Sequence, residues 1–154
     1  SHDGTPFDAW LFDAAQPRGL ILVCHGYRAN WLQIIEIADG LRRRGYAVVA
    51  MNLRGHGGRP GPCTFGVRDR QDLEAILTWR SRQPALASLP VGMLGWSLGG
   101  AVACQLAAQQ PQIKAVALDS TFARLFPGRS SFPSTARAGG TAASSRASSF
   151  SPSS

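Results

Sequence analysis

The stretch Gly95-Trp96-Ser97-Leu98-Gly99-Gly100, read as GWSLGG, lies where an apolar strand pattern changes into a helix pattern. A sharp strand-to-helix turn exposes a serine hydroxyl above a sheet, and the glycines at positions 95 and 99 leave the room that such a turn needs. The first amides of the following helix point at the same place. We therefore interpret Ser97 as a nucleophile and the backbone amide of Leu98 as an oxyanion donor. The alternative is a Gly-Ser-Gly turn without chemistry.

A second oxyanion donor is predicted in the loop that follows an earlier buried strand. The apolar run LILVC, residues 20–24, ends in His25-Gly26-Tyr27. Because a developing oxyanion is stabilised by preorganised N–H groups, we assign the second donor to the backbone amide of Tyr27. His25 is expected to hold this loop, and the role of catalytic base is its alternative.

Strand and helix patterns alternate along the chain and predict the fold class. Expected strands cover about residues 6–14, 20–24, 46–51, 91–94 and 114–118, and expected helices cover about residues 30–44, 67–81 and 98–110. Most of the strands are continuous apolar runs, which is typical of a mostly parallel sheet with helices on both faces. We predict an α/β domain over residues 1–125.

The texture of the sequence changes after this domain. From Gly128 onward the chain is rich in serine and alanine and contains no Leu, Ile, Val or Met. Such a composition buries too little apolar surface to offset the entropy of ordering the chain. We predict that residues 126–154 form a disordered tail, and one hypothesis is that this tail is translated out of frame.

Charge and cysteine content exclude several classes of function. The net charge is +7, but the last 35 residues hold four arginines and no acidic residue, so they carry more than half of this excess. No nucleic-acid motif accompanies the remaining basic residues. The three cysteines, Cys24, Cys63 and Cys104, lack paired spacing, which favours a reducing, cytoplasmic location. No membrane-spanning segment, metal-ligand spacing or nucleotide-binding loop is present. We expect no metal, no cofactor and no nucleic-acid partner.

Taken together, five segments resemble the α/β-hydrolase superfamily, and within it the Bem46-like and serine-aminopeptidase-like serine hydrolases. They are HGYRANW, GYAVVAMNLRGHGGRPG, TFGVRDRQDL, GWSLGGAVA and IKAVALDSTFARL. The resemblance implies an α/β-hydrolase fold and an acyl-enzyme at Ser97 formed from a small ester, thioester or amide. It also implies that the amides of Tyr27 and Leu98 form the oxyanion hole and that Arg54–Gly57 is mainly structural. Asn52 and Arg59 depart from the family, which usually has Asp and often Ser there.

The acid and the histidine of the family's triad are not found at their usual places. They follow the nucleophile in the chain, but Asp119 is the one carboxylate after Ser97 and no histidine follows it. Some members use the position of Asp119 for the acid, although a structural strand end is the more common reading. His2 and His56 are not natural replacements for the base. The chain thus resembles a family member truncated before the acid and histidine, with its last strands missing.

Three hypotheses stay open at this point. The first is an active serine hydrolase, impaired by the missing histidine. The second is an inactive truncated relative. The third is a scaffold module that uses an exposed sheet edge to bind a partner or a second copy of itself.

Overall fold

The computed structural model describes Ser1 and residues 3–121, so the tail expected over residues 126–154 lies outside the described part of the chain. The described residues form one five-stranded sheet with the order β1-β3-β2-β4-β5. The strands are β1 (Ala9–Phe12), β2 (Leu20–Cys24), β3 (Ala47–Met51), β4 (Val91–Trp96) and β5 (Ile113–Asp119). Strand β1 runs antiparallel to β3, and the other three pairings are parallel. The predicted α/β class with a mostly parallel sheet is confirmed.

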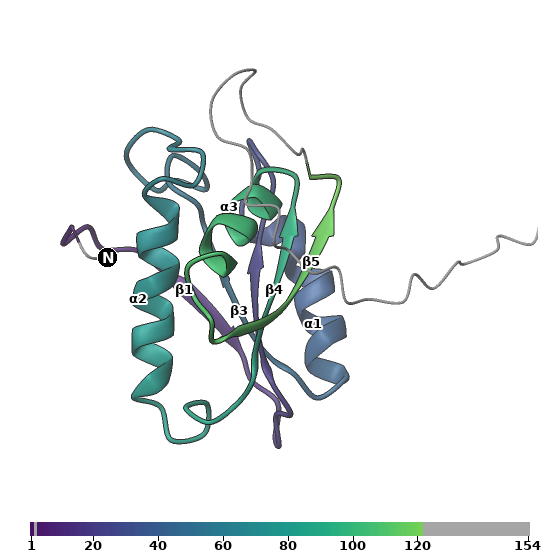
Figure 1. Cartoon of the computed structure of the whole chain (residues 1–154). Coiled ribbons are helices and arrows are strands. Elements are labelled where there is room, and N and C mark those ends of the chain that lie inside the picture. Colours follow the sequence, from purple (N-terminus) through teal and green to yellow (C-terminus); the bar gives the residue numbers. More distant parts are fainter. Residues whose placement is uncertain (2, 122–154) are drawn as a thin grey trace, which may run out of the picture.

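Helices cover both faces of this sheet (Figure 1). Helices α2 (Asp69–Ser81) and α3 (Leu98–Ala107) lie on one face, where their apolar side chains pack with those of β2, β3 and β4. The short helix η1 (Trp31–Ile34) and α1 (Ile35–Arg43) lie on the opposite face. Because β2, β3, β4 and β5 run parallel, the loops that follow them gather at one end of the sheet.

The helix boundaries differ modestly from those expected. The segment beginning near Asn30 starts as the 3₁₀ turn η1, because the Asn30 side chain accepts a hydrogen bond from the Leu32 amide at 2.9 Å. Gly45, with φ of 81°, follows the end of α1, as predicted. The first strand is four residues long rather than nine, since the polar ends of the expected segment do not pair with β3.

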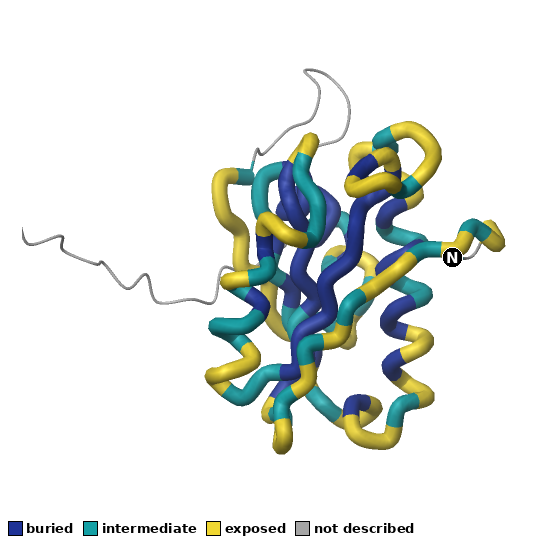
Figure 2. The backbone as a smooth tube through the Cα atoms, turned by 180° about the vertical axis from the view of Figure 1, so that it is seen from behind, coloured by how far each residue is buried: buried dark blue, intermediate teal, exposed yellow. Residues whose placement is uncertain are grey.

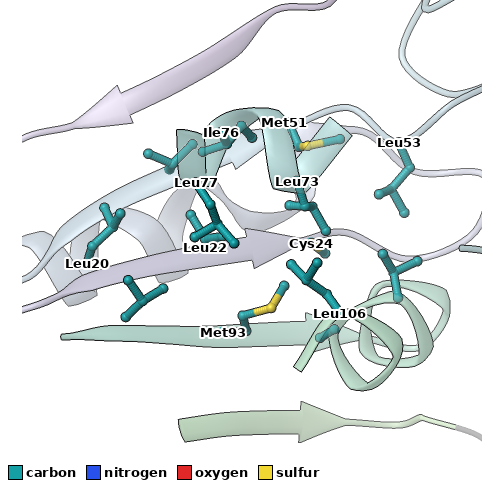
Figure 3. Close-up of a cluster of buried hydrophobic side chains, with 14 of the residues drawn as sticks. Leu20, Leu22, Cys24, Met51, Leu53, Leu73, Ile76, Leu77, Met93 and Leu106 are labelled. Carbon is teal, nitrogen blue, oxygen red and sulfur yellow. The ribbon is translucent and has the colours of Figure 1, made fainter. Parts of the chain in front are cut away.

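The larger core cluster lies between the sheet and the helices α2 and α3 (Figure 3). Leucines and methionines of the central strands, such as Leu22 and Met93, contact Leu73, Leu77 and Leu106 of the helices. All of these side chains are fully or almost fully buried. This rigid layer supports the carboxyl ends of β2, β3 and β4.

Burial falls off at the sheet edge formed by β5. Figure 2 shows the central strands buried and the outer parts of the chain exposed. Every residue of β5 from Lys114 to Asp119 is exposed, including Val116 and Leu118. The sequence predicts an exposed sheet edge at this strand. Within the described residues this strand pairs with β4 alone, so its outer edge has no neighbour.

Candidate functional site

The turn between β4 and α3 holds Ser97 in an unusual backbone conformation. Its φ is 50° and its ψ is −111°. A residue with a side chain pays a steric penalty at positive φ, so such a conformation persists only where the surrounding structure imposes it. Ser97 therefore lies on the strand-to-helix turn that the sequence predicts, in a strained conformation, and its side chain is half-buried at the carboxyl end of the sheet.

Glycines let other parts of the backbone pass close to this turn. A Cβ atom at Gly95 would overlap the backbone of Gly99 and Gly100. A Cβ atom at Gly99 would overlap the carbonyl oxygens of Cys24 and His25. The turn can therefore fold tightly on itself and press against the end of β2 only while glycine occupies both positions.

The end of β5 anchors the turn through the main chain. The Ser97 amide donates a hydrogen bond to the Asp119 carbonyl at 2.8 Å, and the Thr121 hydroxyl donates to the Ser97 carbonyl at 3.4 Å. The Asp119 carboxylate is exposed and accepts a hydrogen bond from the Ser120 hydroxyl at 2.8 Å. Asp119 thus lies beside the elbow, and no histidine in the described residues contacts its carboxylate.

The loop after β2 lies directly against Ser97. A Cβ atom at Gly26 would stand 3.7 Å from the Ser97 Cβ. The Gly26 amide donates to the Gln33 side chain at 2.9 Å, so it is not available to a ligand. Among the described residues, the amides of Tyr27 and Leu98 have no hydrogen-bond partner. Both predicted oxyanion donors are therefore brought to the same end of the sheet as Ser97.

His25 holds this loop in place. Its Nε2 accepts a hydrogen bond from the Leu53 amide at 3.0 Å, so the proton lies on Nδ1, which donates to the Gly26 carbonyl at 2.8 Å. The ring is completely buried. Burial lowers the pKa of His25 from its ordinary value of 6.5, against the opposing hydrogen bond to Gly26. With both nitrogens engaged, His25 is structural, and its alternative as a base is not supported.

The two departures from the family pattern are built into the loop after β3. The Asn52 side chain accepts a hydrogen bond from the Trp31 amide at 2.8 Å and donates one to the Gly57 carbonyl at 3.1 Å. An ionised Asp could accept the first bond but could not donate the second. Arg59 donates to the Asn52 carbonyl at 3.1 Å and lies 2.8 Å from the carboxylate of Asp72. Both residues therefore stabilise the loop rather than contact Ser97.

A buried ion cluster joins this loop to α2, and sequence reasoning missed it. Arg54 donates two hydrogen bonds to Asp72, at 2.8 and 2.9 Å, and one to Asp3 at 2.6 Å. Burial tends to raise the pKa of Asp72, but hydrogen bonds from Arg54 and Ser1 and the positive charges of Arg59 and Arg54 together outweigh it, and the pKa lies below its ordinary value of 3.8. The cluster keeps charged groups ionised where the loop meets the helix.

The site is bordered by aromatic side chains that sequence reasoning also missed. Tyr27 and Phe65 stack with ring centroids 6.0 Å apart, and His56 meets the edge of Tyr27 at 5.5 Å. Phe65 is in the left-handed region, with φ of 50°. The segment TFGVRDRQDL contains Phe65, but nothing in it identifies Tyr27 as its partner.

Two hollows in the described structure lie away from Ser97. One, of about 360 Å³, is lined by Glu74, Thr78, Gln110 and neighbours, and one, of about 380 Å³, by Phe7, Leu11, Trp79 and neighbours. Within residues 1 and 3–121, no group of three His, Cys, Asp or Glu side chains is placed to hold a metal ion. In the same residues, every helix is too short or too polar to reach across a bilayer.

Comparison with known proteins settles the family. A family model described as the alpha/beta hydrolase fold matches residues 19–150. The chain belongs to the α/β-hydrolase family. A crystal structure of an esterase from Pyrococcus furiosus superposes with a TM-score of 0.69 at 25% identity, covering 77% of this chain and 48% of that one. A hydrolase from Pseudomonas aeruginosa superposes with a TM-score of 0.67 at 30% identity, covering 82% and 46%.

Curated relatives agree with this family assignment. An uncharacterized protein of Mycobacterium tuberculosis is 33% identical over 128 residues, which are 81% of this chain and 44% of that protein. The pimeloyl-[acyl-carrier protein] methyl ester esterase of Neisseria meningitidis is 33% identical over 106 residues, 68% of this chain and 38% of that one. This α/β-hydrolase chain thus spans less than half the length of either relative. The narrower Bem46-like assignment stays a prediction.

Proposed function

We propose that this α/β-hydrolase chain carries the nucleophile and the oxyanion hole of a serine hydrolase that acts on a small ester, thioester or amide. The observation that carries the proposal is the strained Ser97, held at the β4–α3 turn beside the Gly26–Tyr27 loop. The esterase names of two relatives make an ester the first substrate class to test.

In the proposed reaction, the Ser97 hydroxyl oxygen attacks the carbonyl carbon of the substrate. The carbonyl oxygen becomes an oxyanion, which accepts hydrogen bonds from the amides of Tyr27 and Leu98. Collapse of this intermediate breaks the bond to the alcohol, thiol or amine, and the leaving group takes up the proton that the hydroxyl lost. Water then hydrolyses the acyl-enzyme, releases the acid and restores Ser97.

We further propose that acyl transfer by this polypeptide is impaired. The sequence has three histidines, all before Ser97, and the ring nitrogens of His25 are engaged in structural hydrogen bonds. Asp119 would act as an acid only by orienting a histidine. An oxyanion hole without a base retains an acceleration on the order of 10³-fold over water in serine proteases.

Labelling with a fluorophosphonate probe tests the nucleophile. We expect one covalent adduct at Ser97 that forms slowly, because no base activates the hydroxyl, and that is measured by intact mass and peptide mapping of the folded protein after prolonged incubation. Ser97→Ala should lose the adduct, and Ser120→Ala, which changes a nearby exposed serine that also has positive φ, should keep it. Labelling that is absent, or that persists in Ser97→Ala, would count against the proposal.

Turnover of 4-nitrophenyl acetate separates an impaired enzyme from an inactive relative. We expect slow hydrolysis, at most about 10³-fold faster than in buffer, together with an acetyl-enzyme at Ser97 that the Ser97→Ala chain cannot form. Hydrolysis without an acetyl-enzyme at Ser97 would favour the inactive relative. A rate typical of an efficient enzyme, with kcat/KM above about 10⁴ M⁻¹s⁻¹, would contradict the impairment.

A second proposed role is association through the β5 edge. Val116 is 38% exposed and Leu118 is 50% exposed. Both lie on β5, whose outer edge has no neighbouring strand in the described residues. Unpaired strand edges readily pair with another chain. We expect light scattering to detect a dimer that Leu118→Lys converts to a monomer, and a monomer at all concentrations would contradict this role.

We also propose a cytoplasmic, reducing location. Cys24, Cys63 and Cys104 are all free thiols in the structure. Burial raises the pKa of the Cys24 thiol to about 12, which keeps it protonated and unreactive. Cell fractionation that places the protein in a membrane or secreted fraction would contradict this proposal.

A further inference from the structure

We propose that Tyr27 and Phe65, called here the aromatic pair, form a subsite that binds a planar apolar group of the substrate beside Ser97. This inference rests on the proposed function, because it names the substrate class: esters that carry an aromatic ring on the oxygen of the scissile bond.

The aromatic pair is a stacked surface made by two loops that are distant in sequence. The ring centroids lie 6.0 Å apart with an angle of 20° between the planes. The buried His56 supports the Tyr27 ring from its edge at 5.5 Å. Tyr27 nevertheless keeps 55% of its surface exposed and Phe65 37%. Solvent therefore reaches two rings whose relative orientation is already set.

Hydrogen bonds of its neighbours and of its own carbonyl hold Phe65 in its strained conformation. On either side of it, the Thr64 hydroxyl and the Gly66 amide both donate to the Asp69 carboxylate, at 2.6 and 3.1 Å. The Gln105 side chain donates to the Phe65 carbonyl at 3.3 Å. A side chain held at positive φ by its surroundings is a recurrent property of ligand sites. These contacts hold the backbone on both sides of Phe65, whose ring stacks on Tyr27.

The position of Tyr27 relates the aromatic pair to the reaction centre. Its backbone amide is the proposed oxyanion donor, and the preceding Gly26 lies against Ser97. A carbonyl oxygen bound at that amide therefore leaves the adjoining group of the ester within reach of the Tyr27 ring. Stacked or edge-to-face contact with an aromatic ring is favourable beyond simple burial, so a planar group gains more here than a saturated one.

The test compares phenyl acetate with cyclohexyl acetate, two esters that differ in the planarity of one ring. Binding is measured on the Ser97→Ala chain, which does not consume the ester, by NMR titration of backbone amides. We expect shifts at Tyr27 and Gly66 and a preference for phenyl acetate of roughly two- to tenfold in Kd. Adding Phe65→Ala should abolish that preference.

Matched variants keep the result interpretable. Val67→Ala changes another exposed apolar side chain of the same loop and should leave the preference unchanged. Phe65→Leu is the second variant, for use if Phe65→Ala does not fold. It keeps an apolar side chain without a ring, so it should remain folded and lose the preference for phenyl acetate. Equal affinities for the two esters, no shifts at millimolar ester, or a preference that survives both Phe65 variants would overturn the inference.

The outcomes for the subsite and for the proposed function are separable. If Ser97 is not labelled by the fluorophosphonate but phenyl acetate still binds selectively, the proposed function fails and the subsite stands. If Ser97 is labelled but the aromatic pair shows no selectivity, the subsite fails and the proposed nucleophile stands.

Discussion

At the scale of single residues, the site depends on two glycines whose lack of a Cβ atom allows close backbone contacts around Ser97. The positive φ of Ser97 costs on the order of 1–3 kcal/mol, and it persists because the backbone on both sides is tightly packed. That packing needs Gly95 and Gly99, whose missing side chains let the elbow contact itself and the end of β2.

Gly99→Ala is expected to destabilise the fold by about 3 kcal/mol, the upper end of the usual cost of overpacking. Alanine would raise helix propensity by about 1 kcal/mol, but its Cβ would collide with the backbone carbonyls of Cys24 and His25, which cannot move away. Urea denaturation measures the change. Gly92→Ala is the matched control, because its Cβ would meet the Ala115 carbonyl at an ordinary 3.6 Å. Equal stability of the two variants would contradict this account.

His25 should make stability depend on pH below neutrality. Burial lowers its folded-state pKa below 6.5, so the unfolded chain binds a proton that the folded chain does not. The free energy of unfolding should therefore fall as the pH drops below about 6.5, by up to about 1.4 kcal/mol per pH unit. The lowered pKa values of Asp3 and Asp72 act in a separate window, below their ordinary 3.8.

Urea denaturation between pH 7.5 and 5 checks this dependence. His25→Asn is expected to be less stable at pH 7.5, because the Leu53 amide loses its acceptor. It should also show a flatter slope, since the other histidines are present in both proteins. Parallel slopes would show that His25 is not the titrating group.

At the scale of elements, the loop between β3 and α2 is held by charge. The side chain of Arg54 extends from the loop and donates two hydrogen bonds to Asp72 in the first turn of α2. A carboxylate at this place also complements the positive end of the helix. Asp69 in the same turn accepts from the Arg54 amide at 2.7 Å. The loop that carries Phe65 is thus tied to a rigid helix at both acidic residues.

Asp72→Asn should remove much of this support. The change leaves the buried guanidinium groups of Arg54 and Arg59 without their shared carboxylate, and breaking a buried ion pair costs about 3–5 kcal/mol. Asp39→Asn, which changes a partly exposed carboxylate paired with Arg42, should leave the denaturation midpoint almost unchanged. Similar losses in both variants would show that burial of the cluster is not what matters.

Local patterns predict the elements well and their long-range contacts poorly. The apolar runs of β2 and β3, the Asn30 cap and the glycine turn around Ser97 are all encoded by neighbouring residues. The antiparallel direction of β1, the Arg54–Asp72 pair and the stacking of Tyr27 on Phe65 join residues far apart in the chain. No spacing rule specifies such contacts, because they depend on how whole elements pack.

At the scale of the whole molecule, the sheet divides into a well-covered centre and an exposed margin. Leucines of α3 and the central strands are sealed from water, while β5, whose main chain anchors the Ser97 elbow, lies at the edge of the described sheet. The Ser97 turn is therefore supported on one side by a fully buried core and on the other by β5, whose side chains are exposed.

Paired leucine substitutions test this division. Leu106→Ala, at a fully buried position of α3, should lower the free energy of unfolding by about 2–5 kcal/mol through lost burial and the cavity left behind. Leu118→Ala, at a half-exposed position of β5, should cost less than about 1 kcal/mol, since little apolar contact is removed. Urea denaturation at low protein concentration, where association is weak, measures both. If Leu118→Ala lowers the free energy of unfolding as much as Leu106→Ala does, the Leu118 side chain is buried in solution. The strand that anchors Ser97 would then be covered like the core.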